Sequence, residues 1–238
     1  RDRASLDAAV RGVDVVITTA NSAQRGGDDN PQTVDLHGNQ NLIEAAAAAG
    51  VKQFVFVSAS LADAASPIPF LAAKGKTEQL LMAGTMPYTI LAPDAFMDFW
   101  LGVIVGVPAL RGLSVTLVGT GRRKHSFIAS RDVVAYAQAV VDNPAALNRR
   151  LTFGGPQGVS YLEVVEIFGK VLGRPLPVNH VAPGEPIPGL PEAVIPLAAS
   201  FDLFDAVLPG QELAGEFGVR LTTVEEFARA MVGQPAGH

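Results

Sequence analysis

Three apolar segments near the start of the chain alternate with two helical ones, and this order limits the folds open to it. Residues 13–20, 53–58 and 88–91 are apolar or β-branched with little alternation, which is typical of strands buried on both faces. Helical patterns occupy residues 31–49 and 69–83, and a glycine follows each of them. Strands that alternate with helices predict a parallel sheet with right-handed crossovers. The sequence therefore predicts a doubly wound α/β fold.

The composition narrows the classes of function. Hydrophobic residues make up 48% of the 238 residues and charged residues 17%, so the chain can bury a sizeable core. A net charge of −5 argues against nucleic acid as a partner, and without cysteine there are no disulfides and no thiolate chemistry. The longest apolar run, Phe99–Leu110, is shorter than the roughly 20 residues of a membrane span. No signal peptide is visible, so we expect a cytoplasmic protein that does not enter the membrane.

From Asp94 onward the pattern changes to shorter elements. Ser160 with Glu163, and Thr222 with Glu225, have the spacing of a capping box at the start of a helix. We expect helices at 96–100, 131–141, 160–172, 192–207 and 222–231, and strands at 114–118, 126–129 and 151–153.

Several short motifs occur in an order that is more specific than any one of them. They are Asp14–Ala20, Val34–Ala46, Gly50–Ser58, Lys74 with Thr77 and Glu78, Tyr88–Pro93 with Phe96, Gly119–Phe127, Arg131–Val133 and Gly154–Pro156. This succession resembles the NmrA-like branch of the atypical short-chain dehydrogenase/reductase superfamily, and the resemblance covers almost the whole chain.

The resemblance implies a Rossmann-like sheet with a smaller C-terminal substrate-binding region. Family members carry about two further βα units, roughly 60 residues, before the helix expected at 2–11, and the first of these holds the phosphate-binding glycines. This chain has no G-x-G-x-x-G motif, so we expect it to lack those units and to leave strand 13–20 as an open edge. We expect a partial dinucleotide-binding domain at 1–112 and a C-terminal portion at 113–238, interleaved with the sheet.

The resemblance also implies NADP(H) or NAD(H) as cofactor and points to the residues that would touch it. Ligands of such folds lie at the carboxyl ends of the strands. Thr19, Ala20 and Asn21 should then line the adenosine and ribose, Pro93 and Phe96 the nicotinamide, and Lys74 the nicotinamide ribose, with Ser58 beside them. The competing interpretations are a surface lysine for Lys74 and an ordinary strand-end hydroxyl for Ser58. The residue that separates NAD from NADP follows the second strand of the family's sheet, outside this sequence.

The proton relay of active short-chain reductases is incomplete in this chain. Those enzymes pair Tyr and Lys as Tyr-x-x-x-Lys, but Phe70 stands four residues before Lys74, and a phenyl ring has no proton to give. Asp35 also stands where many relatives carry Asn. Two hypotheses follow: a reductase in which Lys74, or a water that it orients, supplies the proton and Ser58 polarises the substrate, or a non-catalytic NADP(H)-binding redox sensor.

The substrate implied by the resemblance is a small apolar carbonyl or quinone. Phe96 and Trp100 are candidates to shape its pocket, and His125 and Phe127 are candidates to line it. Core packing for the aromatic residues and an ordinary loop position for His125 are the competing interpretations. The four histidines share no close spacing and no carboxylate cluster, so no metal site is expected. The oligomeric state is left open.

Overall fold

The chain divides into two compact units. A computed structural model describes residues 2–22, 25, 27–208 and 210–233. Unit 1 comprises residues 1–93 and 134–153, and unit 2 comprises residues 94–133 and 154–238. The domain boundary expected after residue 112 stays a prediction; the residues on either side of it both belong to unit 2.

Unit 1 is built on a parallel sheet. Its described strands pair in the order β1-β2-β3-β6, every pair parallel. Their bounds are β1 (Val15–Thr18), β2 (Gln53–Val57), β3 (Tyr88–Pro93) and β6 (Arg149–Phe153). The parallel sheet predicted from the apolar segments is confirmed. Strand β2 is buried at all five positions, whereas Ile17 of β1, the strand at the edge of the described sheet, is 47% exposed.

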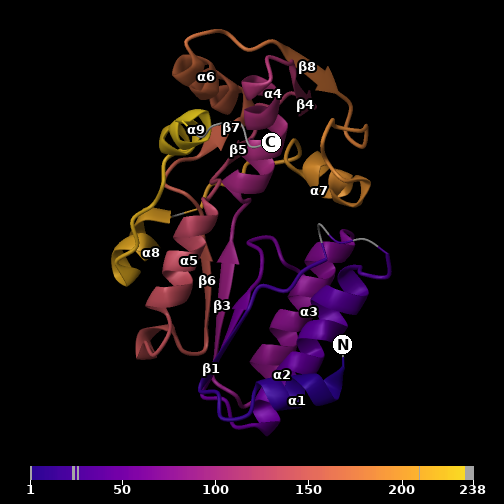
Figure 1. Ribbon diagram of the computed structural model, residues 1–238, viewed down its shortest axis with the longest axis vertical. Helices are drawn as coiled ribbons and strands as arrows, with labels where there is room; N and C mark the ends of the chain where they lie inside the picture. Colours follow the sequence, from indigo (N-terminus) through magenta and orange to yellow (C-terminus); the bar gives the residue numbers. More distant parts are fainter. Residues whose placement is uncertain (1, 23–24, 26, 209, 234–238) are drawn as a thin grey trace. The chain divides into compact units, whose positions relative to one another are not determined.

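Helices cover the sheet of unit 1. Figure 1 shows α1, α2 and α3 together on one side of it, and the end of α5 that belongs to unit 1 lies beside β6 on the other. The bounds are α1 (Arg3–Ala9), η1 (Pro31–Gly38), α2 (Asn39–Ala48), α3 (Pro69–Ala83), α5 (Ser130–Ala139) and η3 (Pro144–Ala146). One core cluster of this unit consists of Ala46, Val51, Phe54, Phe56, Leu81 and Ile90.

The helix predicted at 31–49 forms in two parts. Its first half, η1, is a π-helix, and only α2 is α-helical. At the junction the carbonyl oxygen of Asp35 accepts hydrogen bonds from the side chains of Asn39 (3.0 Å) and Thr77 (2.9 Å). Side-chain donors at that carbonyl compete with the regular helix ladder, which accounts for the wider turn. The loop before η1 contains residues 23, 24 and 26, which lie outside the described residues.

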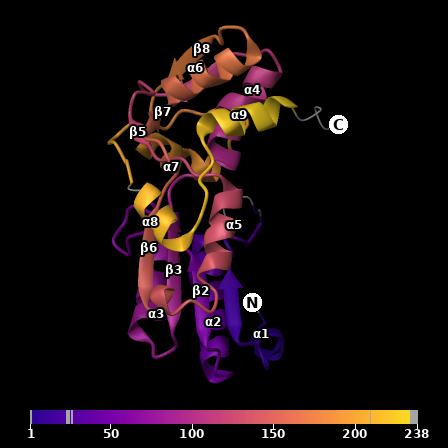
Figure 2. The same ribbon diagram turned by 90° about the vertical axis from the view of Figure 1, so that its left-hand side faces the viewer.

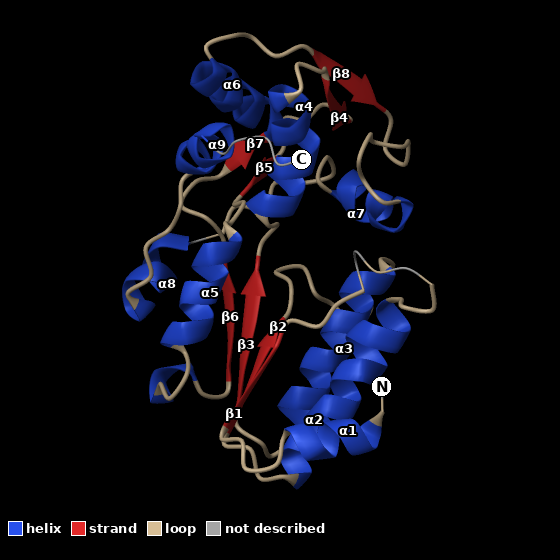
Figure 3. Cartoon of the chain, viewed as in Figure 1, coloured by secondary structure: helices blue, strands red, loops and turns tan. Residues whose placement is uncertain are grey.

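Unit 2 consists of short strands and helices. In the described part, β4 pairs with β8 in parallel and β5 with β7 antiparallel, as Figure 3 shows for β4 and β8. Helices α6 and α9 pack against each other and against η2, and Figure 2 shows α6 and α9 side by side. The bounds are η2 (Met97–Gly106), α4 (Val107–Leu110), β4 (Val115–Val118), β5 (Lys124–His125), β7 (Val159–Ser160), α6 (Tyr161–Leu172), β8 (Val178–Val181), η4 (Glu192–Val194), α7 (Ile195–Ser200), α8 (Gly210–Phe217) and α9 (Val224–Gly233).

Some sequence predictions for unit 2 are wrong in detail. The strand expected at 126–129 is instead the two-residue β5 followed by a single bridge between Phe96 and Ile128. The helix expected at 192–207 ends at Ser200, and β8 and α8 were not foreseen. These elements are short, so they carry too little periodic pattern to be recognised.

The two capping boxes have different outcomes. Ser160 caps α6 as predicted, with Glu163 returning the hydrogen bond. The second box begins one residue later than predicted, because Thr223 and Glu226 bond reciprocally. Thr222 is engaged elsewhere: its backbone N–H and its hydroxyl each donate to the buried carboxylate of Asp132 at 2.7 Å.

No described helix is long and apolar enough to cross a membrane.

Gly75 provides a test of the packing around α3. Alanine inside a helix is normally more stable than glycine by about 1 kcal/mol, but a Cβ at Gly75 would lie 2.3 Å from the backbone nitrogen of Ala64. We therefore expect Gly75→Ala to lower the free energy of unfolding by about 1–3 kcal/mol. The matched control is Gly215→Ala in α8, where a Cβ meets nothing within 4 Å and where stability should rise slightly. Urea unfolding followed by circular dichroism measures both, and a Gly75→Ala variant as stable as the parent would contradict the packing.

Candidate functional site

Lys74 is buried at the carboxyl ends of two neighbouring strands. Its side chain projects from α3 and the residue is 2% exposed, so it is not a surface lysine. The Nζ atom donates to the carbonyl oxygen of Val57 at 3.1 Å and to that of Ala20 at 3.4 Å. Val57 is the last residue of β2, and Ala20 lies two residues beyond β1. The fold therefore brings Lys74 to the strand ends where cofactors of doubly wound sheets bind.

Asp35 is the charged partner of this amine. Its Oδ1 lies 3.6 Å from Lys74 Nζ, beyond hydrogen-bond distance, and has no hydrogen-bond partner although it is buried. Its Oδ2 accepts from the backbone N–H of Ser22 (3.0 Å) and from the Ser22 hydroxyl (2.7 Å). Burial lowers the pKa of Lys74 from its ordinary value, and the negative charges of Asp35 and Glu78 offset only part of that effect.

Aromatic rings complete the surroundings of the amine. Nζ lies 4.8 Å from the centroid of the Phe56 ring and 5.6 Å from that of Phe70, within the range of cation–π contacts. Phe70 thus stands next to Lys74, as expected from the spacing of the relay motif. Its ring contributes a face for the cation and no exchangeable proton.

Ser58 belongs to a polar network beside Lys74. Its hydroxyl donates to Glu78 Oε1 at 2.5 Å, and Glu78 Oε2 accepts from Arg150 Nε at 2.8 Å. Arg150 also donates to the carbonyl oxygens of Ala59 and Ser60, which fixes the loop after β2. A serine hydroxyl can donate one hydrogen bond, and in this arrangement Ser58 donates it to Glu78.

The remaining cofactor candidates fall in different places. Thr19, Ala20 and Asn21 are exposed at the end of β1, and Ala20 touches Lys74 as described. Pro93 is buried at the end of β3, where its carbonyl oxygen accepts from the N–H of Ser60 at 2.8 Å. These residues of unit 1 gather at one end of the sheet. Phe96 belongs to unit 2, where it is half-buried and bridges to Ile128.

The substrate candidates Trp100, His125 and Phe127 meet around a residue that the sequence did not single out. All three rings contact Phe201, with centroid distances of 4.8 Å for Trp100, 4.8 Å for His125 and 5.9 Å for Phe127. The three residues are buried, so His125 is not an ordinary loop histidine. Its Nε2 lies 2.9 Å from the carbonyl oxygen of Phe201. Among the described residues, no group of histidines and carboxylates is suited to a metal ion.

Sequence reasoning missed Arg150, Tyr161 and Phe201. The sequence could indicate Glu78 as a neighbour of Lys74, because Glu78 lies one turn further along α3 and so on the same helix face. Arg150 reaches the network from β6, and no local pattern indicates that approach. Phe201 lies within the helix expected at 192–207, and nothing in that pattern indicates which rings it meets. Tyr161 has the position of an ordinary first helical residue after the cap Ser160.

Comparison with known proteins places the chain in a family. The profile of the NmrA-like family matches residues 1–228. The chain belongs to the NmrA-like family. Among solved structures, the chain is similar to a quinone oxidoreductase of Escherichia coli that is described as NADPH-dependent, with a TM-score of 0.77 and 22% identity over 97% of this chain and 80% of that one. This likeness confirms the Rossmann-type fold.

Two curated relatives are similar in sequence. An NAD(P)H azoreductase of Xenophilus azovorans is 28% identical, with 97% of this chain and 79% of the relative covered. The photosystem II assembly factor Ycf39 of Trieres chinensis is 29% identical, with 74% of this chain and 54% of the relative covered. The chain therefore spans about half the length of that second relative.

Replacement of Asp35 by asparagine tests the electrostatics of the pair. Asp35→Asn removes the negative charge nearest to the amine, so the pKa of Lys74 should fall further below its ordinary value. The unfolded chain holds the proton of Lys74 more tightly than the folded one, so this group makes stability rise with pH between its folded pKa and 10.5. In Asp35→Asn that window should begin at lower pH.

The pKa is measured by NMR titration of lysine side chains labelled at Cε. The matched control is Asp14→Asn, which removes the partner of the exposed Lys52 at 3.0 Å and should leave Lys74 unchanged. A Lys74 pKa at or above the ordinary value in the parent chain would refute the buried site.

Proposed function

We propose that this chain acts in an NAD(P)H-dependent reductase of small apolar carbonyl or quinone compounds. The observation that carries the proposal is the buried pair of Lys74 and Asp35 at the carboxyl ends of β1 and β2. The names of the azoreductase and quinone oxidoreductase to which the chain is similar support the same class of reaction. The substrate is a small molecule in this proposal, and the cytoplasmic location expected from the sequence stays a prediction.

The pair fits a ribose hydroxyl. A lysine ammonium has three donors, and Nζ uses two of them on the carbonyls of Val57 and Ala20. Asp35 Oδ1 is a buried acceptor without a hydrogen bond. A hydroxyl accepts one hydrogen bond and donates another. A single ribose hydroxyl could therefore accept from the third donor of Lys74 and donate to Asp35 Oδ1. For the pyrophosphate the sequence offers no G-x-G-x-x-G turn, so the fit concerns the ribose end of the cofactor.

The chemistry divides between the cofactor and this chain. The dinucleotide, when bound, supplies hydride to the substrate. The chain must supply the proton, and in this proposal Lys74 does so through its third N–H, with the ribose hydroxyl as the relay to the substrate. Burial lowers the pKa of Lys74 and so makes the ammonium a stronger acid than an exposed lysine. Phe70 cannot take that part. Polarisation of the substrate by Ser58 stays a prediction, and it requires the hydroxyl to turn away from Glu78.

A second candidate is a redox-responsive regulator that binds NADP(H) without turnover. Phe70 in the place of the relay tyrosine favours it, because the standard proton donor is missing. The names of the reductases to which the chain is similar support the first candidate over this one. Tight cofactor binding without NADPH oxidation would support this function over the first.

Replacement of Lys74 distinguishes the two candidates. In the protein, Lys74→Met should lower kcat for NADPH-dependent reduction of quinones or aldehydes by about 10²–10⁴, the usual contribution of a general acid. Lys76→Met is the matched control, since Lys76 is exposed two residues further along α3 and should leave kcat unchanged. Thermal unfolding checks that both variants are folded. Turnover that persists in Lys74→Met would eliminate Lys74 as the proton donor.

A further inference from the structure

Phe201 occupies a cluster of aromatic rings inside unit 2. Besides Trp100, His125 and Phe127, the ring of Tyr161 lies 5.9 Å from it between centroids, and most of these contacts are edge-on. Rings around a central ring are the arrangement in which a planar aromatic group is held. Here the central ring is one of the chain's own, and Phe201 itself is only half-buried.

Tyr161 places one polar atom against this cluster. The residue is 7% exposed, and its buried hydroxyl has no hydrogen-bond partner. Burial, followed by the charge of Asp94, raises the pKa of the phenol well above its ordinary value, so the hydroxyl keeps its proton. Leaving such a group unsatisfied is costly and calls for an explanation. An acceptor on a ligand would provide the missing partner.

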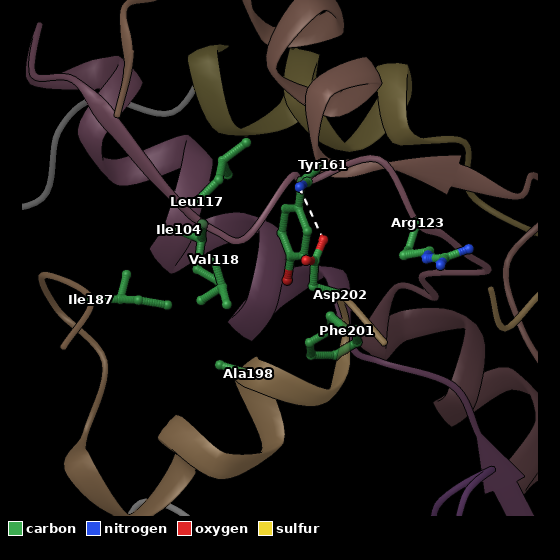
Figure 4. Close-up of a pocket in the computed structure, with 10 residues that line it drawn as sticks. Ile104, Leu117, Val118, Arg123, Tyr161, Ile187, Ala198, Phe201 and Asp202 are labelled. Carbon is green, nitrogen blue, oxygen red and sulfur yellow. Dashed lines mark hydrogen bonds between the residues drawn. The ribbon is translucent and has the colours of Figure 1, made fainter. Parts of the chain in front are cut away.

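The hydroxyl faces an apolar pocket. Figure 4 shows the Tyr161 ring between Val118 and Asp202, with its hydroxyl directed toward Phe201. Ile104, Leu117, Ile187 and Ala198 form much of the remaining wall. The enclosed volume is about 10 Å³, room for about one water molecule. With Phe201 in place the pocket is therefore closed to any ring-sized ligand.

The chain at Phe201 is anchored at two points, so rotation about the side-chain bonds is the simplest way for its ring to leave. The carbonyl oxygen lies 2.9 Å from His125 Nε2. The next residue, Asp202, accepts at Oδ1 from the backbone N–H (3.0 Å) and the hydroxyl (2.8 Å) of Thr120. Rotation of one ring would open the cluster and leave its walls in position.

We infer that this cluster is the substrate-recognition site of unit 2, that it takes a planar quinone or aromatic carbonyl compound in the place of the Phe201 ring, and that the Tyr161 hydroxyl donates to the carbonyl oxygen of that ligand. The inference rests on the proposed function and specifies its substrate class. Tyr161 selects for a carbonyl, and Phe201 limits access.

Direct binding tests the inference without turnover. The probes are 2,3-dimethyl-1,4-naphthoquinone and 2,3-dimethylnaphthalene, which share a shape and differ in the carbonyl oxygens. Calorimetry measures the dissociation constants. The fluorescence of Trp100, the single tryptophan of the sequence, reports from a ring 4.8 Å from Phe201. The parent chain should bind the quinone more tightly than the hydrocarbon.

Two variants separate the roles. Tyr161→Phe should weaken quinone binding about tenfold, the value of one hydrogen bond, and leave hydrocarbon binding unchanged. Phe201→Ala should tighten binding of both probes about tenfold, as expected when a competing internal ring that fills the site nine-tenths of the time is removed. The controls are Tyr136→Phe, which removes another fully buried phenol in unit 1, and Phe204→Ala, which removes an exposed ring three residues from Phe201.

The outcomes are distinct. Equal quinone affinity in the parent chain and Tyr161→Phe, or no gain in Phe201→Ala beyond that of Phe204→Ala, would overturn the inference even if NADPH oxidation occurs. Selective quinone binding that depends on Tyr161, in a protein that never oxidises NADPH, would uphold the recognition site and refute the reductase.

Discussion

Burial of strand β2 on both faces is the constraint on which unit 1 depends. All five residues of β2 are buried, and a parallel strand of this kind must be covered by helices that return the chain to the same edge. The crossovers through α2 and α3 follow from that requirement. They also place the carboxyl ends of β1, β2 and β3 at one end of the sheet, so Ala20, Ser58 and Pro93 gather there although they are far apart in the sequence.

Burial of the Lys74 ammonium at this end of the sheet costs solvation energy, and the charges of Asp35 and Glu78 offset only part of that cost. An amine buried like that of Lys74 loses its hydration, and two carbonyl oxygens and the carboxylate of Asp35 replace it. Asp35 is fixed by Ser22 and not by Lys74, which keeps the ion pair longer than a hydrogen bond. A loosely matched buried pair is poor support for stability. It is well suited to receiving a hydroxyl and to releasing a proton.

The interior of unit 2 is packed differently from that of unit 1. Its short strands cannot form a large sheet, and rings that pack edge to face provide much of its interior. The four rings around Phe201, those of Trp100, His125, Phe127 and Tyr161, come from three segments of the chain, and the Tyr161 ring carries a hydroxyl with no hydrogen-bond partner. Unit 1 therefore holds the charged groups suited to cofactor contact and proton transfer, whereas unit 2 holds the rings suited to recognising a flat apolar molecule.

The sequence by itself determined the parallel sheet and its crossover helices, because both follow from hydrophobic periodicity within single segments. The choice of Lys74 as a cofactor residue came from the resemblance to the family's succession of motifs. Only the tertiary structure decided that β6 joins the sheet, that Arg150 restrains Glu78 and thereby Ser58, and that Phe201 lies among Trp100, His125 and Tyr161. Contacts between residues so distant along the chain depend on where whole elements pack. A local sequence pattern does not specify that packing, because the same pattern allows an element to pack against many different elements.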